Sequence, residues 1–246
     1  MIRNPPVAGR ADLAGILEAH RRYLETDRRE GARADLRGAD LSGVSLVAAD
    51  LRRVRLAHAR LDGADLSRAH LQGANLVGAS LRGAHLREAD LSAARLSGAQ
   101  LTAADLGKAR MERAEMEFAL FAQANLVGAQ LAESDLSGAS LERANLSAAD
   151  LQQVNLRGAD LREARLDGAD LRAARLGGTI LNGASLRDCD LTGAYLRVAK
   201  LDGADLSGAD LRDTVGLTTA QIASARCDGR TWLPSDLGAG GNHGRC

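Results

Sequence analysis

Aromatic residues are nearly absent from this chain of 246 residues, in which Phe, Trp and Tyr together supply five residues, or 2%. The hydrophobic content is an ordinary 45%, so the chain can bury a core, but that core must consist of aliphatic side chains of nearly one size. Such uniformity disfavours the interlocking of differently shaped side chains that fills an ordinary globular core. The composition therefore points away from a conventional globular domain.

The chain also lacks an excess of charge of either sign. Lys and Arg number 32, as do Asp and Glu, so the formal net charge is zero. A strongly basic nucleic-acid binder is therefore disfavoured, as is a strongly acidic tail. No stretch approaches the roughly 18–20 apolar residues that cross a bilayer, and the N-terminus has no apolar core of signal-peptide length. We expect no direct contact with nucleic acid and none with a membrane.

Cysteine is scarce, and its spacing favours a reducing compartment. Cys189, Cys227 and Cys246 are odd in number, far apart and without a neighbouring Cys or His at metal-ligand spacing. They support neither a disulfide framework nor a zinc site, and Cys189 is expected to be a buried, inert thiol. The sequence therefore predicts a cytoplasmic protein with no metal and no cofactor.

What the chain has in abundance is a repeat of five residues. From Leu36 to Leu211 every fifth position is Leu, apart from Met111, Met116 and Phe121, which gives 36 units without insertion or deletion. A small residue, mostly Ala, stands two positions before each of these, and Asp or Asn often lies between the two.

A period of five fits neither a helix, around which Leu would spread, nor a continuous strand, on which Leu would alternate between faces. It fits a three-residue extended piece followed by a two-residue corner, where Gly tolerates unusual backbone angles. Ala and Leu then point inward and Asp points outward. Repetition of this unit makes a coil, and successive coils stack about 4.8 Å apart.

These units follow the pattern A(D/N)LxG, as in Ala74-Asn75-Leu76, and closely resemble the pentapeptide-repeat family over residues 34–213. The resemblance implies an all-β fold: a right-handed, quadrilateral parallel β-helix with four units per coil and about nine coils. Stacked coils leave open edges at both ends, so helical caps are expected at the N- and C-termini.

The N-terminal segment, residues 1–33, is expected to supply the first of these caps. Residues 11–30 show an apolar stripe at helical spacing, opposite several arginines. Gly31 suits the C-terminal stop of such a helix. We therefore expect a helical lid over the first coil.

A C-terminal capping and dimerisation module is expected over residues 214–237. Thr218 and Gln221 have capping-box spacing, which predicts a short helix that runs to about Arg226. This module is smaller than the N-terminal lid, and related proteins pair at this end, so we expect a homodimer around a two-fold axis. Its expected contacts are Leu217, Ile222, Trp232 and Leu233. The polar, Gly-rich residues 238–246 are expected to be a disordered tail.

One outward column could carry function through charge, because residues twenty apart become vertical neighbours. Its last four members are acidic: Asp150, Asp170, Asp190 and Asp210. The resemblance implies one interpretation, a stripe that imitates a nucleic-acid backbone, as in family members that protect DNA gyrase. The alternative is that Asp is simply common in this slot. Arg172, Arg187 and Arg212 lie close by and would neutralise part of the field.

A second candidate surface is apolar. Phe118 and Leu120 lie at a corner and at an outward position, where the motif prefers Gly or polar residues. Ile180 lies on the outward column of Leu120, three coils further on. Isolated apolar residues on a surface are ordinary, but an adjacent pair beside charged neighbours is the best candidate contact for a partner.

The sequence thus predicts a non-enzymatic, rigid scaffold for protein–protein interaction, with a partner that it does not identify. Catalysis needs groups that converge in a concavity, whereas this architecture offers four flat sides and a filled interior. The alternative is a DNA mimic that binds a type II topoisomerase, DNA gyrase, and modulates or protects it.

Overall fold

The computed structural model, which describes residues 12–237 and 244–246, shows each unit as a short extended piece and a corner. In the first unit, the N–H of Ala39 donates to the carbonyl of Leu36 at 3.1 Å and closes a turn over two residues. The second corner residue has a positive φ in all 36 units, from Gly38 (+67°) to Asp213 (+57°), although only 16 of these positions are Gly. The stack therefore imposes this conformation even where the local sequence does not favour it.

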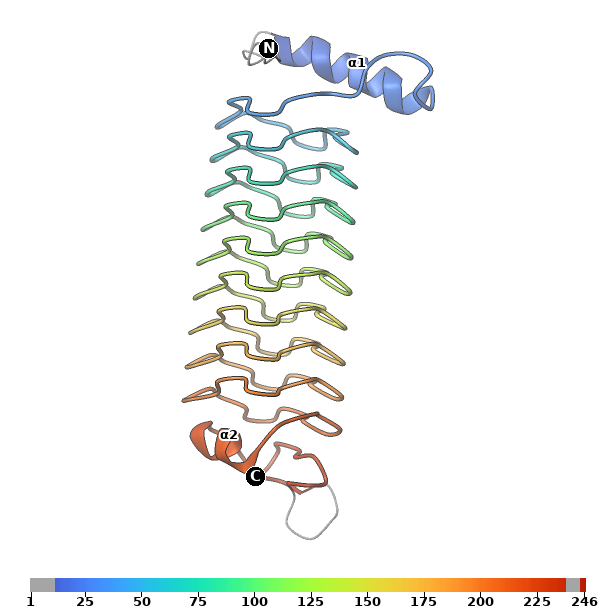
Figure 1. Ribbon diagram of the computed structural model, residues 1–246. Coiled ribbons are helices and arrows are strands. Elements are labelled where there is room, and N and C mark those ends of the chain that lie inside the picture. The colour runs from blue at the N-terminus through green and yellow to red at the C-terminus, as the bar shows by residue number, and fades with distance from the viewer. Residues whose placement is uncertain (1–11, 238–243) are drawn as a thin grey trace, which may run out of the picture.

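Successive coils pair in parallel with a register of twenty residues. Asp35 bridges Arg55, and this spacing continues through the repeats. The N–H of Leu36 donates to the carbonyl of Arg55 at 2.7 Å. Four units complete a coil, so 36 units make nine coils, as the repeat predicts (Figure 1). We name each of the four sides after its first outward residue: the Asp35 side, the Asp40 side, the Ser45 side and the Asp50 side.

The interior is filled by the inward Leu and Ala residues. Leu156, in the seventh coil, is 0% exposed, as are Met111, Met116 and Phe121, so the three departures from Leu amount to local repacking. Cys189 is also buried, and its Sγ lies 2.9 Å from a backbone carbonyl oxygen. Burial raises the pKa of this thiol to about 12, which agrees with the expected inert thiol.

Helix α1, Leu13–Glu25, lies across the N-terminal end of the stack (Figure 1). Leu13, Ile16 and Leu17 pack against the core. The expected helix over residues 11–30 is too long: α1 ends at Glu25, and residues 1–11 lie outside the described part.

The role expected for Gly31 is also wrong. The backbone makes a further turn after α1, in which the N–H of Glu30 donates to the hydroxyl of Thr26 at 2.9 Å. A Cβ on Gly31 would lie 2.1 Å from the carbonyl oxygen of Ala19. Glycine is therefore required where the chain passes back beneath the helix, rather than at the helix end.

At the other end, helix α2 spans Thr219–Ser224 and begins with the expected capping box of Thr218 and Gln221. The chain then continues the ladder of the stack. The N–H of Leu206 donates to the carbonyl of Arg226 at 2.7 Å, and the N–H of Leu211 donates to that of Trp232 at 2.9 Å. These carbonyls satisfy donors that the last coil would otherwise leave open.

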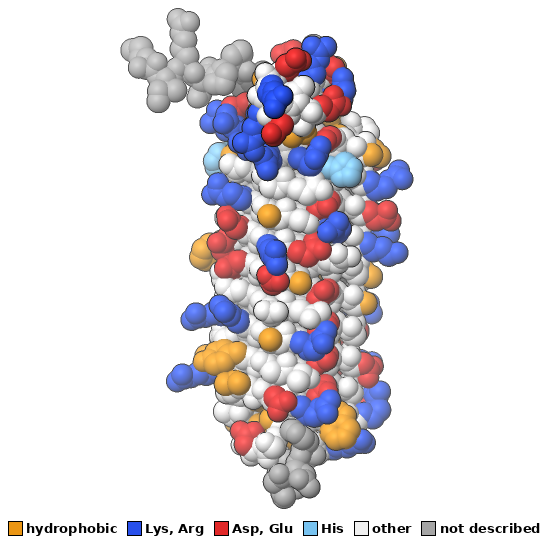
Figure 2. Space-filling view, turned by 90° about the vertical axis from the view of Figure 1, so that its right-hand side faces the viewer, with side chains coloured by type: hydrophobic (Ala, Val, Ile, Leu, Met, Phe, Trp, Pro, Cys, Tyr) orange, Lys and Arg blue, Asp and Glu red, His pale blue; other side chains and the backbone are white. Residues whose placement is uncertain are grey.

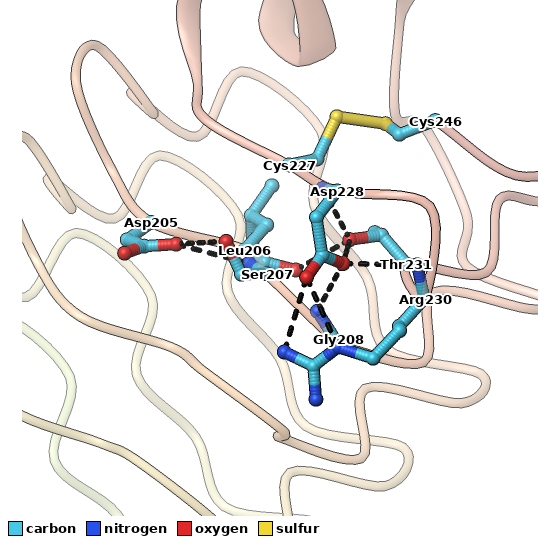
Figure 3. The surroundings of a disulfide bond; sticks show 9 residues. All are labelled: Asp205, Leu206, Ser207, Gly208, Cys227, Asp228, Arg230, Thr231 and Cys246. Carbon is cyan, nitrogen blue, oxygen red and sulfur yellow. Dashed lines mark hydrogen bonds and ion pairs between the residues drawn. A yellow bond between two sulfur atoms is a disulfide. The ribbon is translucent and has the colours of Figure 1, made fainter.

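The expectation of unpaired cysteines is wrong for two of the three. Cys227 and Cys246 form a disulfide, with their Cα atoms 5.9 Å apart (Figure 3). Arg245 pairs antiparallel with Trp232 and so brings the tail back to the stack. Residues 244–246 are therefore ordered, contrary to the expected disordered tail, of which residues 238–243 lie outside the described part. Cysteine usage thus no longer favours a reducing compartment.

Candidate functional site

The outer surface is the only place where the stack presents many side chains to a ligand, because its interior is filled. Across residues 12–237 and 244–246, no three His, Cys, Asp or Glu side chains gather as a metal site would require. Neither helix of this part of the chain is long and apolar enough to cross a membrane. An open hollow of about 490 Å³ lies beside Asp135 and Arg175, and Asn155 already bonds Asp135 there at 3.0 Å.

The outward Asp or Asn of a unit has a structural task that the repeat pattern alone did not reveal. Its side-chain oxygen accepts a hydrogen bond from the backbone N–H two residues further on. Asp40 accepts from Ser42 at 3.1 Å, and Asn145 accepts from Ser147 at 3.1 Å. This first corner N–H has no carbonyl acceptor in the ladder, so the side chain supplies the missing partner. The sequence feature that could have predicted this hydrogen bond is an Asp or Asn two residues before the first residue of the turn.

The acidic column occurs where the sequence places it, on the Asp50 side. Asp150, Asp170, Asp190 and Asp210 bridge one another in consecutive coils. Each of the four accepts a hydrogen bond from the N–H two residues on, at 2.9–3.2 Å. The hydrogen bonds to the corners are therefore enough to explain why Asp occurs at these positions, and no partner protein is needed to explain it.

Arginines neutralise part of this column. Arg172 Nη2 lies 2.6 Å from Asp170, and its Nε lies 3.7 Å from Asp190. The hydrogen bond from Arg172 lowers the pKa of Asp170. Arg212 pairs with Asp210 at 2.5 Å. Figure 2 shows acidic and basic side chains interleaved along the stack rather than one continuous acidic band.

The neutralising role expected for Arg187 is wrong. Its Nε pairs with Asp205, on the Ser45 side, at 2.6 Å. The corner that carries Arg187 lies between the Ser45 and Asp50 sides, and Asp205 is the carboxylate that it reaches.

The apolar candidates separate into two places. Phe118, which is 70% exposed, lies at the corner between the Asp35 and Asp40 sides. Leu120, which is 41% exposed, lies on the adjoining Asp40 side. The Phe118 ring lies over the next coil, because a Cβ on Gly138 would be 2.6 Å from its Cε1. Ile180 is half-buried on the Leu120 column, about 14 Å away at three coil spacings. The structure joins Phe118 and Leu120 and leaves Ile180 apart.

The expected dimer contacts are used mainly inside the chain. Leu217 and Leu233 are 6% and 7% exposed and belong to the core, and Ile222 packs partly against it. The Trp232 ring lies between two guanidinium groups, 5.4 Å from that of Arg212 and 4.3 Å from that of Arg245.

Three exposed apolar residues near the C-terminal end were missed. Tyr195 and Val215 are neighbours on the Asp35 side, and Val198 lies at the corner beside them. The sequence feature that could have identified them is the one that identified Phe118: an apolar residue at an outward or corner position of the unit.

A profile of the family described as pentapeptide repeats matches the chain, in 8 copies. The matched segments are residues 32–68, 64–102, 99–138, 139–178 and 179–215. A search among curated proteins gave no match.

Solved structures with similarity to the chain include HetL, a pentapeptide repeat protein involved in heterocyst differentiation regulation in the cyanobacterium Nostoc. It is 33% identical, with 90% of this chain and 96% of that chain covered and a TM-score of 0.43. QnrB1, a plasmid-mediated fluoroquinolone resistance protein, is 18% identical, with 80% and 93% covered and a TM-score of 0.36. A pentapeptide repeat protein of the Arabidopsis thaliana thylakoid lumen is 30% identical, with 42% and 68% covered and a TM-score of 0.23.

Proposed function

The chain belongs to the pentapeptide-repeat family, and from that premise we propose that it is a non-enzymatic, rigid scaffold that binds a partner protein through its outer surface. The family fold is a right-handed β-helix solenoid. In a solenoid each coil contacts only its neighbours, so outward residues can vary without disturbing the core. Binding specificity therefore lies in those outward side chains.

The observation that supports this proposal is the exposure of Phe118. Its ring occupies a corner at which other coils carry Gly, such as Gly98 and Gly138, and it is 70% exposed beside the exposed Leu120. The core does not need either side chain at these positions. An aromatic ring on a rigid support is a typical anchor in protein interfaces.

Recovery of partners from an extract of the native host tests the proposal. Full-length protein carrying Phe118→Ser and Leu120→Ser should lose a partner that the wild type retains. Val127→Ser is the matched control, because Val127 is a 37% exposed corner residue on the other side of the stack. Equal recovery by all three proteins would contradict a contact at Phe118 and Leu120.

We further propose that α1 and α2 act as caps. Each is held by a polar side chain that bonds the backbone of the adjoining coils. His20 Nδ1 accepts from the N–H of Ala34 at 3.1 Å. Gln221 Nε2 donates to the carbonyls of Leu196 and Ala199 at 3.0 and 2.8 Å. Caps of this kind prevent the open ends from pairing with other chains.

The homodimer is retained as a proposal in narrower form. Since Leu217 and Leu233 are buried within the chain, the half-exposed Ile222 and Trp232 are the contacts that a second copy could use. Light scattering distinguishes a dimer of about 51 kDa from a monomer of 25.7 kDa. A monomer at micromolar concentration would mean that α2 and the disulfide-linked tail close the stack without a partner copy.

Gyrase modulation is a second candidate, supported by the four stacked aspartates from Asp150 to Asp210. A supercoiling assay with DNA gyrase, with and without a quinolone, tests it. Inhibition or protection that falls steeply with salt would support mimicry. No effect on gyrase would leave the scaffold as the function.

A cytoplasmic location is likewise a proposal, and the disulfide provides its test. A reducing cytoplasm should keep Cys227 and Cys246 as thiols. Thiol labelling in cells that are quenched with acid would report free thiols if the location is correct and a protected pair if it is not.

A further inference from the structure

The lower half of the stack holds four cations that form no ion pair with a carboxylate. Residues 114–213, all of them described, include ten Lys and Arg side chains. Six lie within 4.0 Å of an Asp or Glu oxygen: Arg143, Arg162, Arg165, Arg172, Arg187 and Arg212. The four that have no such ion pair are Arg157, Arg175, Arg197 and Lys200.

These four cations are not scattered. Arg175 lies on the Asp35 side, Lys200 lies on the Asp40 side, and Arg157 and Arg197 lie at the corner between those sides, two coils apart. All four are exposed. The paired arginines at Arg162, Arg172 and Arg212 lie at the other corners of these coils. Within residues 114–213, positive charge without an ion pair is therefore concentrated on a single edge.

The same edge holds the missed apolar residues. Tyr195 is bridged to Arg175 in the coil above and to Val215 in the segment below. Tyr195 is 36% exposed, Val198 is 72% exposed and Val215 is 54% exposed. We call the surface made by these seven residues the basic edge: Arg157, Arg175, Tyr195, Arg197, Val198, Lys200 and Val215. Figure 2 shows blue and orange side chains side by side at its lower left, over the last coils.

The floor of the basic edge is bare backbone. Gly177 stands between Arg157 and Arg197 at the corner, and a Cβ there would lie 3.1 Å from Cε1 of Tyr195, so the tyrosine ring rests against it. A Cβ on Gly158 or Gly178 would meet nothing within 4 Å. The tyrosine ring therefore lies against Gly177, in the coil between those of Arg157 and Arg197, and presents apolar surface with a cation in the coil on either side.

We infer that the basic edge binds an acidic segment of a partner protein. Carboxylates would pair with the guanidinium groups of Arg157 and Arg197, and an apolar side chain between them would cover Tyr195 and Val198. The two arginines are about 10 Å apart along the stack at two coil spacings, which matches about three residues of extended chain. The inference rests on the proposed function only in that the chain acts by binding a protein.

Nucleic acid fits this surface less well. A duplex is bound through many phosphate contacts, whereas the basic edge has four cations on a chain of zero net charge. Exposed valines gain nothing from phosphates but are buried by an apolar side chain of a protein segment. The mixture of cations and aliphatic surface therefore favours an acidic segment that also carries apolar residues.

Selection from a random peptide library on immobilised full-length protein tests the inference. The peptides recovered should be rich in Asp and Glu and should contain an aromatic or aliphatic residue. Their binding should weaken by about tenfold or more in the variant Arg157→Glu/Arg197→Glu and clearly in Val198→Ser. The matched control is Arg68→Glu/Arg82→Glu, because both residues are exposed, unpaired by any carboxylate within 4.0 Å and far from the basic edge. Circular dichroism verifies that each variant is folded.

Three results would overturn the inference: a recovered pool without acidic enrichment, peptides that bind the charge-reversed variant as well as the wild type, or a DNA duplex that binds the edge more tightly than any peptide. Self-association that disappears in Arg157→Glu/Arg197→Glu would also overturn it, since the occupant would then be a second copy. None of these results bears on Phe118 and Leu120, which the host extract tests separately.

Discussion

The imidazole of His20 joins helix α1 to the end of the first coil: its Nε2 lies 3.1 Å from the carbonyl oxygen of Arg52, at the corner that follows Asp50. Its Nδ1 meanwhile accepts from the N–H of Ala34. One neutral ring thus donates to one backbone group and accepts from another, while being 0% exposed. A protonated ring would carry hydrogen on both nitrogens and could not accept from Ala34.

Acid should therefore loosen α1. Burial lowers the pKa of His20 from its ordinary value of 6.5, while the hydrogen bond to the carbonyl of Arg52 and the charge of Asp50 act in the opposite direction and the charge of Arg33 acts in the same direction. Because the detached helix binds the proton more readily than the docked helix, docking is fully stabilised above about pH 6.5 and weakens as the pH falls below it. Hydrogen exchange of the α1 amides, corrected for intrinsic rates, should show protection lost between pH 7.5 and 5.

The control for this prediction is His20→Ala. In that variant the α1 amides should be poorly protected at every pH, and their protection should not change between pH 7.5 and 5. A wild-type helix whose protection is constant down to pH 5 would mean that the apolar contacts of Leu13, Ile16 and Leu17 hold it without His20.

A charge placed inside the stack should prevent folding. Leu156 is 0% exposed, so Leu156→Asp would bury a carboxylate in an apolar column without a partner. We expect loss of soluble folded protein. Arg157→Asp introduces the same side chain one residue later, at an exposed position, and should fold normally. Thermal unfolding of the two variants tests whether residue 156 points inward and residue 157 outward. A stable Leu156→Asp protein would contradict that assignment.

The acidic column should tolerate loss of its charge but not of its oxygens. Changing Asp150, Asp170, Asp190 and Asp210 together to Asn keeps an acceptor for each corner N–H and removes repulsion between stacked charges. The free energy of unfolding should stay equal or rise slightly, since the exposed pairs with Arg172 and Arg212 contribute little.

Changing the same four residues to Ala should cost about 1 kcal/mol per position, because each corner N–H loses its acceptor. Urea unfolding of both variants gives the comparison. Equal stability of the Asn and Ala variants would show that the corner bonds are unimportant. A gyrase effect that is present in the wild type and lost in the Asn variant would favour mimicry.

The inward and outward side chains of the repeat show what the sequence could and could not predict. The period of five determines which residues face inward, so the core positions from Leu36 to Leu211 follow from the repeat alone. The preference for Asp or Asn appears as a surface feature in the sequence, because its hydrogen bond to the corner depends on the backbone angles of the turn. The expected pairing of Arg187 with the acidic column was wrong for a similar reason, since a long side chain at a corner can reach carboxylates on either adjoining side.

The C-terminal disulfide could not be predicted because it depends on the path of the tail. Cys227 and Cys246 are separated by 19 residues, and only the return of Arg245 alongside Trp232 brings them together. Polar, Gly-rich composition was a poor guide to order here. The basic edge was missed because the absence of ion pairs becomes visible only when every carboxylate has been placed.

Reduction should release this tail. Dithiothreitol would convert the disulfide to two thiols, and Arg245 would leave the ring of Trp232, the single tryptophan of the chain. We expect a red shift of tryptophan emission and a loss of stability at the C-terminal end of about 3 kcal/mol for a loop of this length.

The variant Cys227→Ser/Cys246→Ser is the control for reduction. It should resemble the reduced protein and should not respond to dithiothreitol, since Cys189 is buried. If reduction leaves the emission of the wild type unchanged, the antiparallel pairing of residues 232 and 245 holds the tail without the covalent bond.

The proposed function is tested most directly by crosslinking from the site itself. Full-length protein with the photoreactive residue p-benzoylphenylalanine in place of Phe118 would be expressed in the native host and irradiated, beside a control with the same residue in place of Val127. A scaffold that binds through Phe118 and Leu120 should give a discrete crosslinked partner from position 118 and none from position 127. No adduct from position 118, or the same adducts from both positions, would contradict the account.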